Sequence, residues 1–579
     1  MDQRLPRRTL TLLLIFTVLG VYYPAIFAPL NTIDDPGLYQ YLLNTNSFSF
    51  HDIFVPGGSG TYYRPLLTVS FLADKYVWGL EESFMHLENV LFHLGNTLLV
   101  YAVAFRLSRL LKVASPLPAL LAALFFAIHP LNTESVVWIS GRTDLLAGMF
   151  VLLSMFFLLA EKRTTITSLL AAFSLLIACL AKDTAIFFLP AAFIFPFYCM
   201  DGGSPGLNGV FQTVRNNLSH FAVFTAAGAG YFAFRELAFS RGDLGAKQVL
   251  THVAGSQGSG LLLSLRLVLK AAGFYVKKLF LPWPLNFGII HVSDYYIVVG
   301  VLLFVVVITL LVRRTLVGFF FLAAASIGSS ALLVPLLKMT WTPIAERYMY
   351  MPAAFFVVGI TFVLYRGAGR WYSSKFMVPA VACLAAVAIY ATSQRAILWQ
   401  SNLALYEDCL RQSPDFIPAQ NEIANALYAR GDVRKACEIV SSMTPPADFV
   451  NGQYVYLSKA VALANSGDIK GARRLLMQAL KNPGKHEVAI IQHLLQLNDT
   501  ELLKGDDDRR TLYPQNVKLL DRLYQLTGDP FCQYRLGQTY LFMGKREKAR
   551  DALQIVIAKS SSQAYYYPAA KKLLEKLSH

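Results

Sequence analysis

Uncharged apolar stretches alternate with short polar segments over the first two thirds of the chain. A membrane-spanning helix needs about 20 predominantly apolar residues. Windows of this kind lie at 9–30, 89–105, 114–131, 145–160, 164–181, 184–200, 216–234, 295–312, 315–337, 348–365 and 376–394. The pattern predicts an all-α, polytopic membrane domain of about eleven transmembrane helices over residues 1–394. The first window follows Arg4, Arg7 and Arg8, and ten windows follow it, so we interpret it as an uncleaved anchor.

Basic residues in the connections predict the orientation. With a cytoplasmic N-terminus, the short inner segments hold 14 basic residues, whereas the short outer ones hold six: Arg64, Lys75, Arg142, Lys182, Lys338 and Arg347. Because inner loops are enriched in Lys and Arg, eleven crossings place the C-terminal domain outside, in a periplasm or a lumen. Residues 261–281 carry Arg266 and Lys270 one turn apart and predict an amphipathic helix on the outer membrane face. If that helix spanned the membrane, the C-terminal domain would be cytoplasmic.

Amphipathic helices with a period near 34 residues follow Arg395 and predict a soluble tetratricopeptide repeat α-solenoid over residues 395–579. Small residues recur in one frame: Ala424, Gly431, Ala436, Ala460, Gly467, Ala472, Gly537, Gly544 and Ala549. Such residues allow close helix packing, and glycine ends the first helix of a unit. The 77 residues from Gly467 to Gly544 leave room for two more degenerate units. A solenoid of this kind presents a groove for a protein or peptide; a purely structural extension is the alternative.

Charge content supports the division into two domains. The first 394 residues contain 44 charged residues and the last 185 also contain 44, or about 11% against about 24%. With a mean hydropathy of +0.45, this excludes a single soluble fold, a disordered chain and a disulfide-rich mini-scaffold. The six cysteines form no CxxC pair, which argues against a structural zinc site. Basic residues of the tail alternate with acidic ones, so we expect no nucleic-acid partner, and the net charge of +16 suits anionic membrane lipid.

The first outer loop, residues 31–85, contains the first candidate chemistry. It opens with Asp34-Asp35-Pro36-Gly37 directly after a crossing. Two adjacent carboxylates can act as a general base or hold a divalent metal, whereas Asp-Pro-Gly is also ordinary turn chemistry.

Further polar residues collect at the predicted outer boundary. The second outer turn contains His129, Glu134, Arg142 and Asp144, and other outer edges contribute Arg64, Lys182 and Arg347. Each ion pair alone would indicate a helix-end anchor. Together on one face, carboxylates beside several cations suit a substrate that is both phosphorylated and membrane-anchored.

His86, Asn89, His93 and Asn96 follow one helix face at spacings of three and four. A polar stripe inside a membrane is costly and faces a cavity or another helix. We favour hydrogen bonds between packed helices over a metal site.

Several motifs in order resemble the transmembrane and tetratricopeptide repeat-containing O-mannosyltransferases and their bacterial relatives in the C superfamily of glycosyltransferases. They are Asp34-Asp35, Tyr63-Arg64-Pro65-Leu66, His129-Pro130, Glu134, Ile139-Ser140-Gly141-Arg142, Asp144-Leu145-Leu146 and Ala345-Glu346-Arg347-Tyr348, followed by the repeats. The resemblance implies transfer of a sugar from a polyprenyl-phosphate donor on the outer membrane face.

The resemblance also implies roles for individual residues. Asp34 is the first choice for the catalytic base, and Asp35 would position the acceptor or an ion. The departing lipid phosphate would be stabilised by four cations, Arg64, Arg142, Lys182 and Arg347. Three further residues would support these cations: His129, Glu134 and Asp144. The family is associated with a lysine–glutamate pair at this position, and Lys182-Asp183 departs from that pair. The resemblance implies no cofactor, and it leaves open whether a divalent metal is required.

Three functional hypotheses follow. The leading one is an inverting glycosyltransferase that moves a hexose, mannose-like, to a hydroxyl group of a protein recruited by the repeats. The second is the same chemistry on a lipid or polysaccharide acceptor. The third is a non-enzymatic membrane scaffold or transporter. We expect a multi-pass protein of a bacterial inner membrane, with the N-terminus cytoplasmic and the repeats periplasmic.

Overall fold

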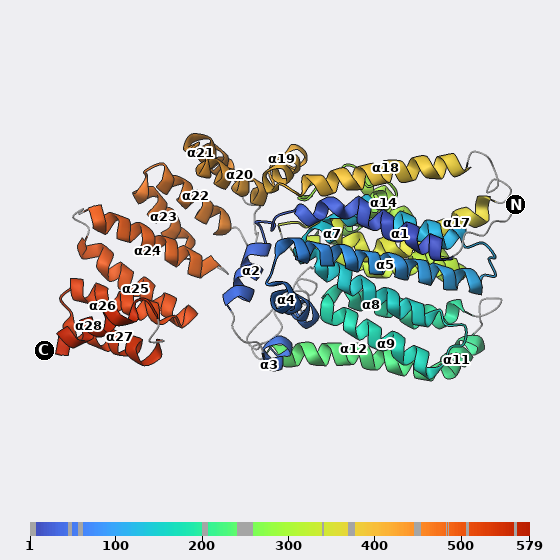
Figure 1. Cartoon of the computed structure of the whole chain (residues 1–579), viewed down its shortest axis with the longest axis horizontal. Coiled ribbons are helices and arrows are strands. Elements are labelled where there is room, and N and C mark those ends of the chain that lie inside the picture. Colours follow the sequence, from blue (N-terminus) through green and yellow to red (C-terminus); the bar gives the residue numbers. More distant parts are fainter. Residues whose placement is uncertain are drawn as a thin grey trace. The chain divides into compact units, whose positions relative to one another are not determined.

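The computed structural model is all-helical in its described part and divides into two compact units, Met1–Ala419 and Gln420–His579 (Figure 1). The structure describes residues 7–44, 49–55, 62–199, 207–239, 259–337, 341–368, 377–444, 453–481, 483, 486–504, 509–560 and 564–578. The predicted boundary at residue 394 lies earlier than the observed one, because residues 395–419 pack with the first unit. Lys338, one of the predicted outer cations, lies outside the described residues.

The first unit is a bundle of apolar helices with short helices at its ends. Its α-helices are α1 (Arg7–Tyr22), α2 (Asp35–Asn44), α3 (Phe50–Phe54), α4 (Pro65–Trp78), α5 (Glu82–Leu110), α6 (Leu117–Ala127), α7 (Thr133–Val137), α8 (Arg142–Leu158), α9 (Thr165–Ala181), α10 (Leu189–Ile194), α11 (Leu207–Asn216), α12 (Leu218–Ala238), α14 (Ser259–Phe280), α15 (Tyr296–Arg313), α16 (Leu316–Leu337), α17 (Tyr350–Ala368), α18 (Met377–Leu398) and α19 (Asn402–Gln412). Helices α5, α8, α9 and α12 lie side by side in this bundle (Figure 1).

The bundle contains seven helices that are long and apolar enough to cross a membrane: Arg8–Phe27, Glu82–Leu110, Ile139–Leu158, Tyr296–Arg313, Leu316–Leu336, Glu346–Gly367 and Val378–Leu398. An eighth span forms if the bent pair Leu117–Ala127 and Pro130–Val137 counts as one. Thr165–Ala181 and Asp183–Tyr198 are shorter apolar helices, and α12 occupies the remaining predicted window. These counts refer to the described residues, and they identify a multi-pass membrane protein.

Helices α14 and α15 form a close antiparallel pair. A Cβ atom on Gly273 would clash with the carbonyl oxygen of Tyr296, and one on Gly300 would clash with that of Leu269. Helix α15 is a candidate membrane span, and α14 runs alongside it in the opposite direction. The prediction of an amphipathic helix on the outer membrane face for residues 261–281 stays a prediction, as does the alternative that this helix spans the membrane and reverses the side of the repeats.

The second unit stacks helical hairpins as predicted. Its helices are α20 (Ile417–Ala429, which begins in the first unit), α21 (Val433–Ser442), α22 (Gln453–Asn465), α23 (Ile469–Ala479), α24 (Glu487–Lys504), α25 (Arg509–Thr527), α26 (Pro530–Phe542), α27 (Arg546–Lys559) and α28 (Tyr567–Ser578). Gly431, Gly467 and Gly544 adopt φ of 82°, 93° and 73° between paired helices, a conformation that favours glycine. One long pair, α24 and α25, occupies the region where we had allowed for two degenerate units.

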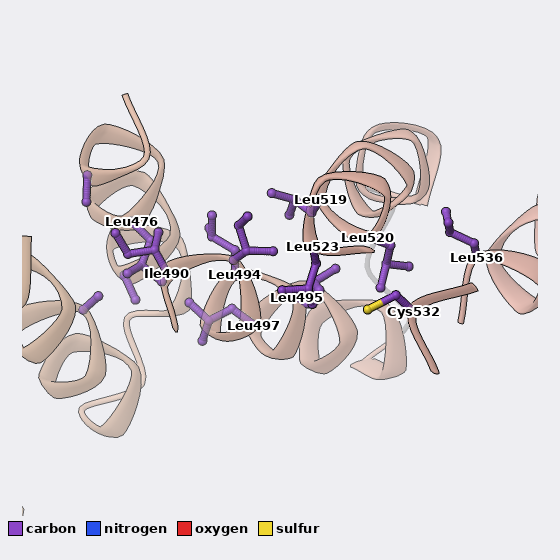
Figure 2. Close-up of a cluster of buried hydrophobic side chains, with 14 of the residues drawn as sticks. Leu476, Ile490, Leu494, Leu495, Leu497, Leu519, Leu520, Leu523, Cys532 and Leu536 are labelled. Carbon is purple, nitrogen blue, oxygen red and sulfur yellow. The ribbon is translucent and has the colours of Figure 1, made fainter. Parts of the chain in front are cut away.

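The core of the second unit is aliphatic (Figure 2). Helices α23 to α26 contribute side chains that are at most 9% exposed, among them Leu476, Ile490, Leu494, Leu520 and Leu536. Each hairpin buries one stripe against its neighbours, which is how stacked repeats obtain a continuous core.

Candidate functional site

Asp34 and Asp35 stand at the start of α2 but differ in their surroundings. Asp34 is exposed, whereas Asp35 is 2% exposed. The Oδ1 atom of Asp35 accepts hydrogen bonds from Trp138 Nε1 at 3.0 Å and from Ser140 Oγ at 2.5 Å. Its Oδ2 atom accepts one from the backbone nitrogen of Asn31 at 2.8 Å. Asp35 therefore anchors the turn, whereas the Asp34 side chain is exposed to solvent.

The environment of Asp35 places its titration near neutral pH. Burial raises the pKa of Asp35 to about 6, against the lowering effect of the hydrogen bonds from Ser140, Asn31 and Trp138; the charge of Asp34 adds to the rise. Donors to a carboxylate favour its charged form. The turn is thus held by an ionised Asp35 above about pH 6, and its anchor weakens below that pH.

A buried ion pair lies on the other side of Trp138. Glu134 on α7 accepts from the guanidinium of Arg347 and, at 3.1 Å, from its backbone nitrogen. Arg347 belongs to the short helix η6 (Glu346–Met349). Its guanidinium carbon lies 4.9 Å from the ring centroid of Trp138 and 5.0 Å from that of Tyr348. One tryptophan therefore contacts both Asp35 and Arg347.

Lys182 provides a second buried cation beside Arg347. Its Nζ atom donates to Asp144 Oδ1 at 2.6 Å and lies 5.6 Å from the ring centroid of Tyr348. Arg64 and Arg347 are both near enough to repel the Lys182 ammonium group. The structure thus brings Arg64, Lys182 and Arg347 together, from three segments that are distant in sequence.

Arg64 is the most open of these cations. Its side chain is 26% exposed, and its Nε atom lies 3.9 Å from Asp183 Oδ2, beyond hydrogen-bond distance. The same carboxylate accepts from Tyr231 and Arg235 at 2.9 Å each. Within the described part of the chain the buried Nε of Arg64 has no hydrogen-bond partner. Two arginines therefore share one carboxylate, which leaves a positive charge available to an anion.

Arg142 has a different environment from the one we predicted. Its side chain is fully buried and donates to Asp74 Oδ2 at 2.6 Å, Asn89 Oδ1 at 2.9 Å and the carbonyl oxygen of Met85 at 2.9 Å. Glu88 completes this set at 3.2 Å. These acceptors belong to α4 and α5 and saturate the guanidinium group. We therefore assign Arg142 to the support of the site and remove it from the proposed phosphate-binding residues.

His129 is also engaged by the protein. Its Nε2 atom lies 3.1 Å from the carbonyl oxygen of Leu279, and its Nδ1 accepts from the backbone nitrogen of Leu131 at 3.3 Å. These bonds brace the bend between α6 and the short helix η2 (Pro130–Asn132). A direct contact between His129 and the cations is not among them.

Other polar groups confirm helix packing within the bundle. His93 contacts the Tyr350 hydroxyl at 2.9 Å, and Asn96 donates to the same hydroxyl at 2.9 Å. Asn89 donates to the carbonyl oxygen of Trp138 at 2.9 Å. Among the residues that the structure describes, no group of three or more His, Cys, Asp or Glu side chains is arranged to hold a metal ion.

A further buried ion pair, which the sequence did not predict, joins Lys278 and Glu346. Lys278 Nζ donates to Glu346 Oε1 at 2.6 Å, and the backbone nitrogen of Asn286 donates to the same oxygen at 3.0 Å. We had placed Lys278 on a surface helix. Ser140 belongs to a motif that we had singled out and Trp138 directly precedes that motif, but nothing local in the sequence indicated that they bind Asp35.

The segment that leads out of the first unit packs on the aspartate turn. The Tyr406 hydroxyl lies 2.8 Å from Thr32 Oγ1, and Asn402 donates to the carbonyl oxygen of Leu30 at 2.8 Å. An open pocket of about 440 Å³ beside this turn is lined by Ala28, Pro29, Tyr39, Leu80, Glu82 and Gln400, among others. Residues 402–406, near the end of the first unit, thus lie beside the turn that holds Asp34.

Comparisons with known proteins find a repeat family in the second unit and partial relatives of the chain. The tetratricopeptide repeat family matches residues 531–561, which confirms the prediction for 531–553. The chain is 40% identical over 102 residues to protein O-mannosyl-transferase TMTC4 of Homo sapiens, covering 16% of this chain and 14% of that protein. It is 41% identical over 98 residues to protein O-mannosyl-transferase TMTC2 of Mus musculus, covering 17% and 11%.

A third relative extends the match slightly. The chain is 34% identical over 137 residues to protein O-mannosyl-transferase Tmtc1 of Drosophila melanogaster, covering 23% of this chain and 15% of the relative. The matched stretches thus span a small part of each relative's length. This distant, partial similarity suggests a membrane glycosyltransferase.

Proposed function

We propose that the chain is an inverting glycosyltransferase that moves a hexose, mannose-like, from a polyprenyl-phosphate donor to a hydroxyl group of a protein on the outer membrane face. One observation carries the proposal: a carboxylate pair and three cations from separate segments meet at one end of an apolar helical bundle. A phosphorylated, membrane-anchored donor matches both the charge and the location of that end. The partial similarity to O-mannosyl-transferases favours sugar transfer.

The donor phosphate would bind Arg64 first. Arg64 has no hydrogen bond to another described residue at its buried Nε and is partly exposed. Lys182 and Arg347 are already paired with Asp144 and Glu134, so they add positive potential behind Arg64. Cations held in place before the reaction stabilise charge as it develops on a leaving group.

Asp34 would be the general base. The acceptor oxygen attacks the anomeric carbon while the bond from that carbon to the phosphate oxygen breaks. The hydroxyl proton passes to the Asp34 carboxylate, and the electron pair of the broken bond stays on the polyprenyl phosphate. Asp35 holds the turn that presents Asp34, consistent with its buried, hydrogen-bonded carboxylate.

The repeats would recruit the protein acceptor. The chain leaves the first unit beside the aspartate turn, which supports a recruiting role for the repeats that follow in the sequence. We keep the proposed topology of about eleven crossings, with the N-terminus in the cytoplasm and the repeats in the periplasm of a bacterial inner membrane. The same chemistry on a lipid or polysaccharide acceptor is the second candidate, and a scaffold or transporter is the third.

The proposal is tested by mass spectrometry of envelope proteins, lipids and polysaccharides from cells that lack the protein or express wild type or a variant at matched levels. Asp34→Asn is the test variant. Asp415→Asn is the control, because Asp415 is an exposed carboxylate of the same unit. We expect proteins to lose a hexose in the deletion strain and in the Asp34→Asn strain. Proteins of the wild-type and Asp415→Asn strains should keep it. Loss from lipid or polysaccharide instead would support the second candidate, and no glycan change would overturn the proposal.

A further inference from the structure

Trp138 connects the two halves of the candidate site. Resting on the proposed transferase function, we propose that Trp138 is a positioning residue: its indole N–H holds Asp35, and its ring holds Arg347, so that the base-bearing turn and the phosphate-binding cations keep a fixed separation. The contacts are the 3.0 Å hydrogen bond to Asp35 Oδ1 and the 4.9 Å approach of the Arg347 guanidinium carbon to the ring centroid.

The backbone of Trp138 is itself fixed from several sides. It lies in extended conformation between α7 and the short helix η3 (Ile139–Gly141). Its carbonyl oxygen accepts from Gly141 N at 2.9 Å and from Asn89 Nδ2 at 2.9 Å. Asn89 is in turn held by the buried Arg142. The network gives the fully buried Arg142 a structural role: it holds Asn89, and Asn89 holds the backbone of Trp138.

Tryptophan combines two properties that this position uses. Its indole nitrogen is a donor without acceptor capacity, which suits a carboxylate, and its ring is the best aromatic partner for a cation. The ring packs edge-on against Phe287 at 6.0 Å between centroids and is 6% exposed. Its orientation is therefore set by packing before any substrate binds.

The titratable neighbours of Asp35 are few, so a pH profile can report on it. Asp34 lies on the same turn and is the one charged group that acts directly on the Asp35 carboxyl. Glu82 on α5 accepts from Leu30 N, and Tyr406 on α19 contacts Asn31. Further titratable or charged groups on the described elements around the turn are His86 on α5, Arg347 on η6 and Lys75 on α4, whose Nζ atom donates to the carbonyl oxygen of Leu42 on α2 at 2.5 Å.

The first test is the pH dependence of sugar transfer by the purified full chain, with a polyprenyl-phosphate hexose as donor. Trp138→Phe removes the indole donor and retains an aromatic ring. Since a lost donor disfavours the carboxylate, we expect the acid limb of kcat to move about one pH unit upward. Ser140→Ala removes the other side-chain donor to the same oxygen and should shift the limb in the same direction.

Trp399→Phe is the matched control. Trp399 is a buried tryptophan that packs on the same Phe287 at 5.4 Å, and its indole nitrogen has no hydrogen-bond partner in the described structure. Its loss should leave the acid limb in place. A merely structural role of Trp138 would lower the active fraction equally at every pH, so superimposable normalised profiles for Trp138→Phe and wild type would overturn the proposal.

The second test separates the two contacts. Trp138→Leu removes the ring as well as the donor, and we expect the donor KM to rise about fivefold, while Ser140→Ala leaves that KM unchanged. An equal KM in Trp138→Leu and Ser140→Ala would contradict the link to Arg347. If wild type transfers no sugar from any polyprenyl-phosphate donor, the proposed function itself has failed; if wild type is active and the variants match it, only the role of Trp138 has failed.

Discussion

The site end of the first unit and the core of the second unit are stabilised by different forces. Among its described residues, the first unit buries four ion pairs whose side chains are at most 15% exposed: Arg142–Asp74, Lys182–Asp144, Arg347–Glu134 and Lys278–Glu346. The second unit buries leucine, isoleucine and alanine (Figure 2). Its ion pairs are more exposed on the whole, as in Arg522–Glu487, where the arginine side chain is 49% exposed.

Buried ion pairs and buried apolar side chains contribute differently to stability. Burying a charged pair costs desolvation that its attraction barely recovers, so such a pair adds little stability. Apolar burial stabilises at about 25 cal/mol per Å². The first unit therefore carries charges that a stable fold alone does not require, which fits a site for an anionic substrate. The second unit has the aliphatic core expected of stacked helical repeats.

The largest expected effect is on turnover at the aspartate turn. Asp34→Asn removes the proposed base and should lower kcat about 10³-fold, with an unchanged unfolding temperature because Asp34 is exposed. Asp35→Asn should lower kcat less and abolish the acid limb near pH 6, because the titrating anchor is gone. Steady-state transfer assays from pH 5 to 8 distinguish the two. Equal losses for both variants would contradict the division of roles.

The next effect is on stability. Arg142→Met leaves Asp74 and Glu88 buried without their cation, and we expect a loss of about 3–5 kcal/mol in the free energy of unfolding. Burial and the neighbouring Glu88 already raise the pKa of Asp74 to about 7 in wild type. Without Arg142 that pKa rises further, so the folded variant favours a protonated Asp74. The loss should therefore be larger at pH 8 than at pH 6, as thermal unfolding in detergent would show.

The features that sequence predicted well are those with local signals. Apolar windows marked the helices of the bundle, and Gly431, Gly467 and Gly544 marked the hairpin turns because left-handed backbone favours glycine. Motif order and topology also grouped Asp34, Arg64, Lys182 and Arg347; the structure brings the three cations together, and the roles of all four stay predictions.

The features that sequence missed depend on contacts between distant segments. Lys278 pairs with Glu346 across 68 residues, and Trp138 reaches Asp35 across 103. Arg142 was assigned to a phosphate because its motif gave no sign that α4 and α5 would enclose it. Burial is a property of the assembled bundle, so residue type and spacing alone could not separate a supporting arginine from a binding one.

A core substitution in the repeats should affect stability without affecting the chemistry. Leu494 is fully buried between helices of the second unit, and Leu494→Ala should cost about 2–5 kcal/mol through lost burial and the resulting cavity. Transfer to a short peptide that does not need recruitment should keep its wild-type kcat. A matched fall in kcat on that peptide would show that the two units are coupled, against the separation drawn above.

The smallest effect is expected at a repeat turn. Gly544 has φ of 73° with open space around the position of a Cβ atom, so Gly544→Ala should cost only the left-handed backbone strain, about 1 kcal/mol. Gly544→Asn should cost less, because asparagine tolerates this conformation.

Gly273 in the first unit is the contrast: a Cβ there meets the carbonyl oxygen of Tyr296, so Gly273→Ala must separate α14 from α15. Thermal unfolding of the three variants checks this order, and equal losses for Gly544→Ala and Gly273→Ala would show that backbone conformation, rather than helix contact, limits both positions.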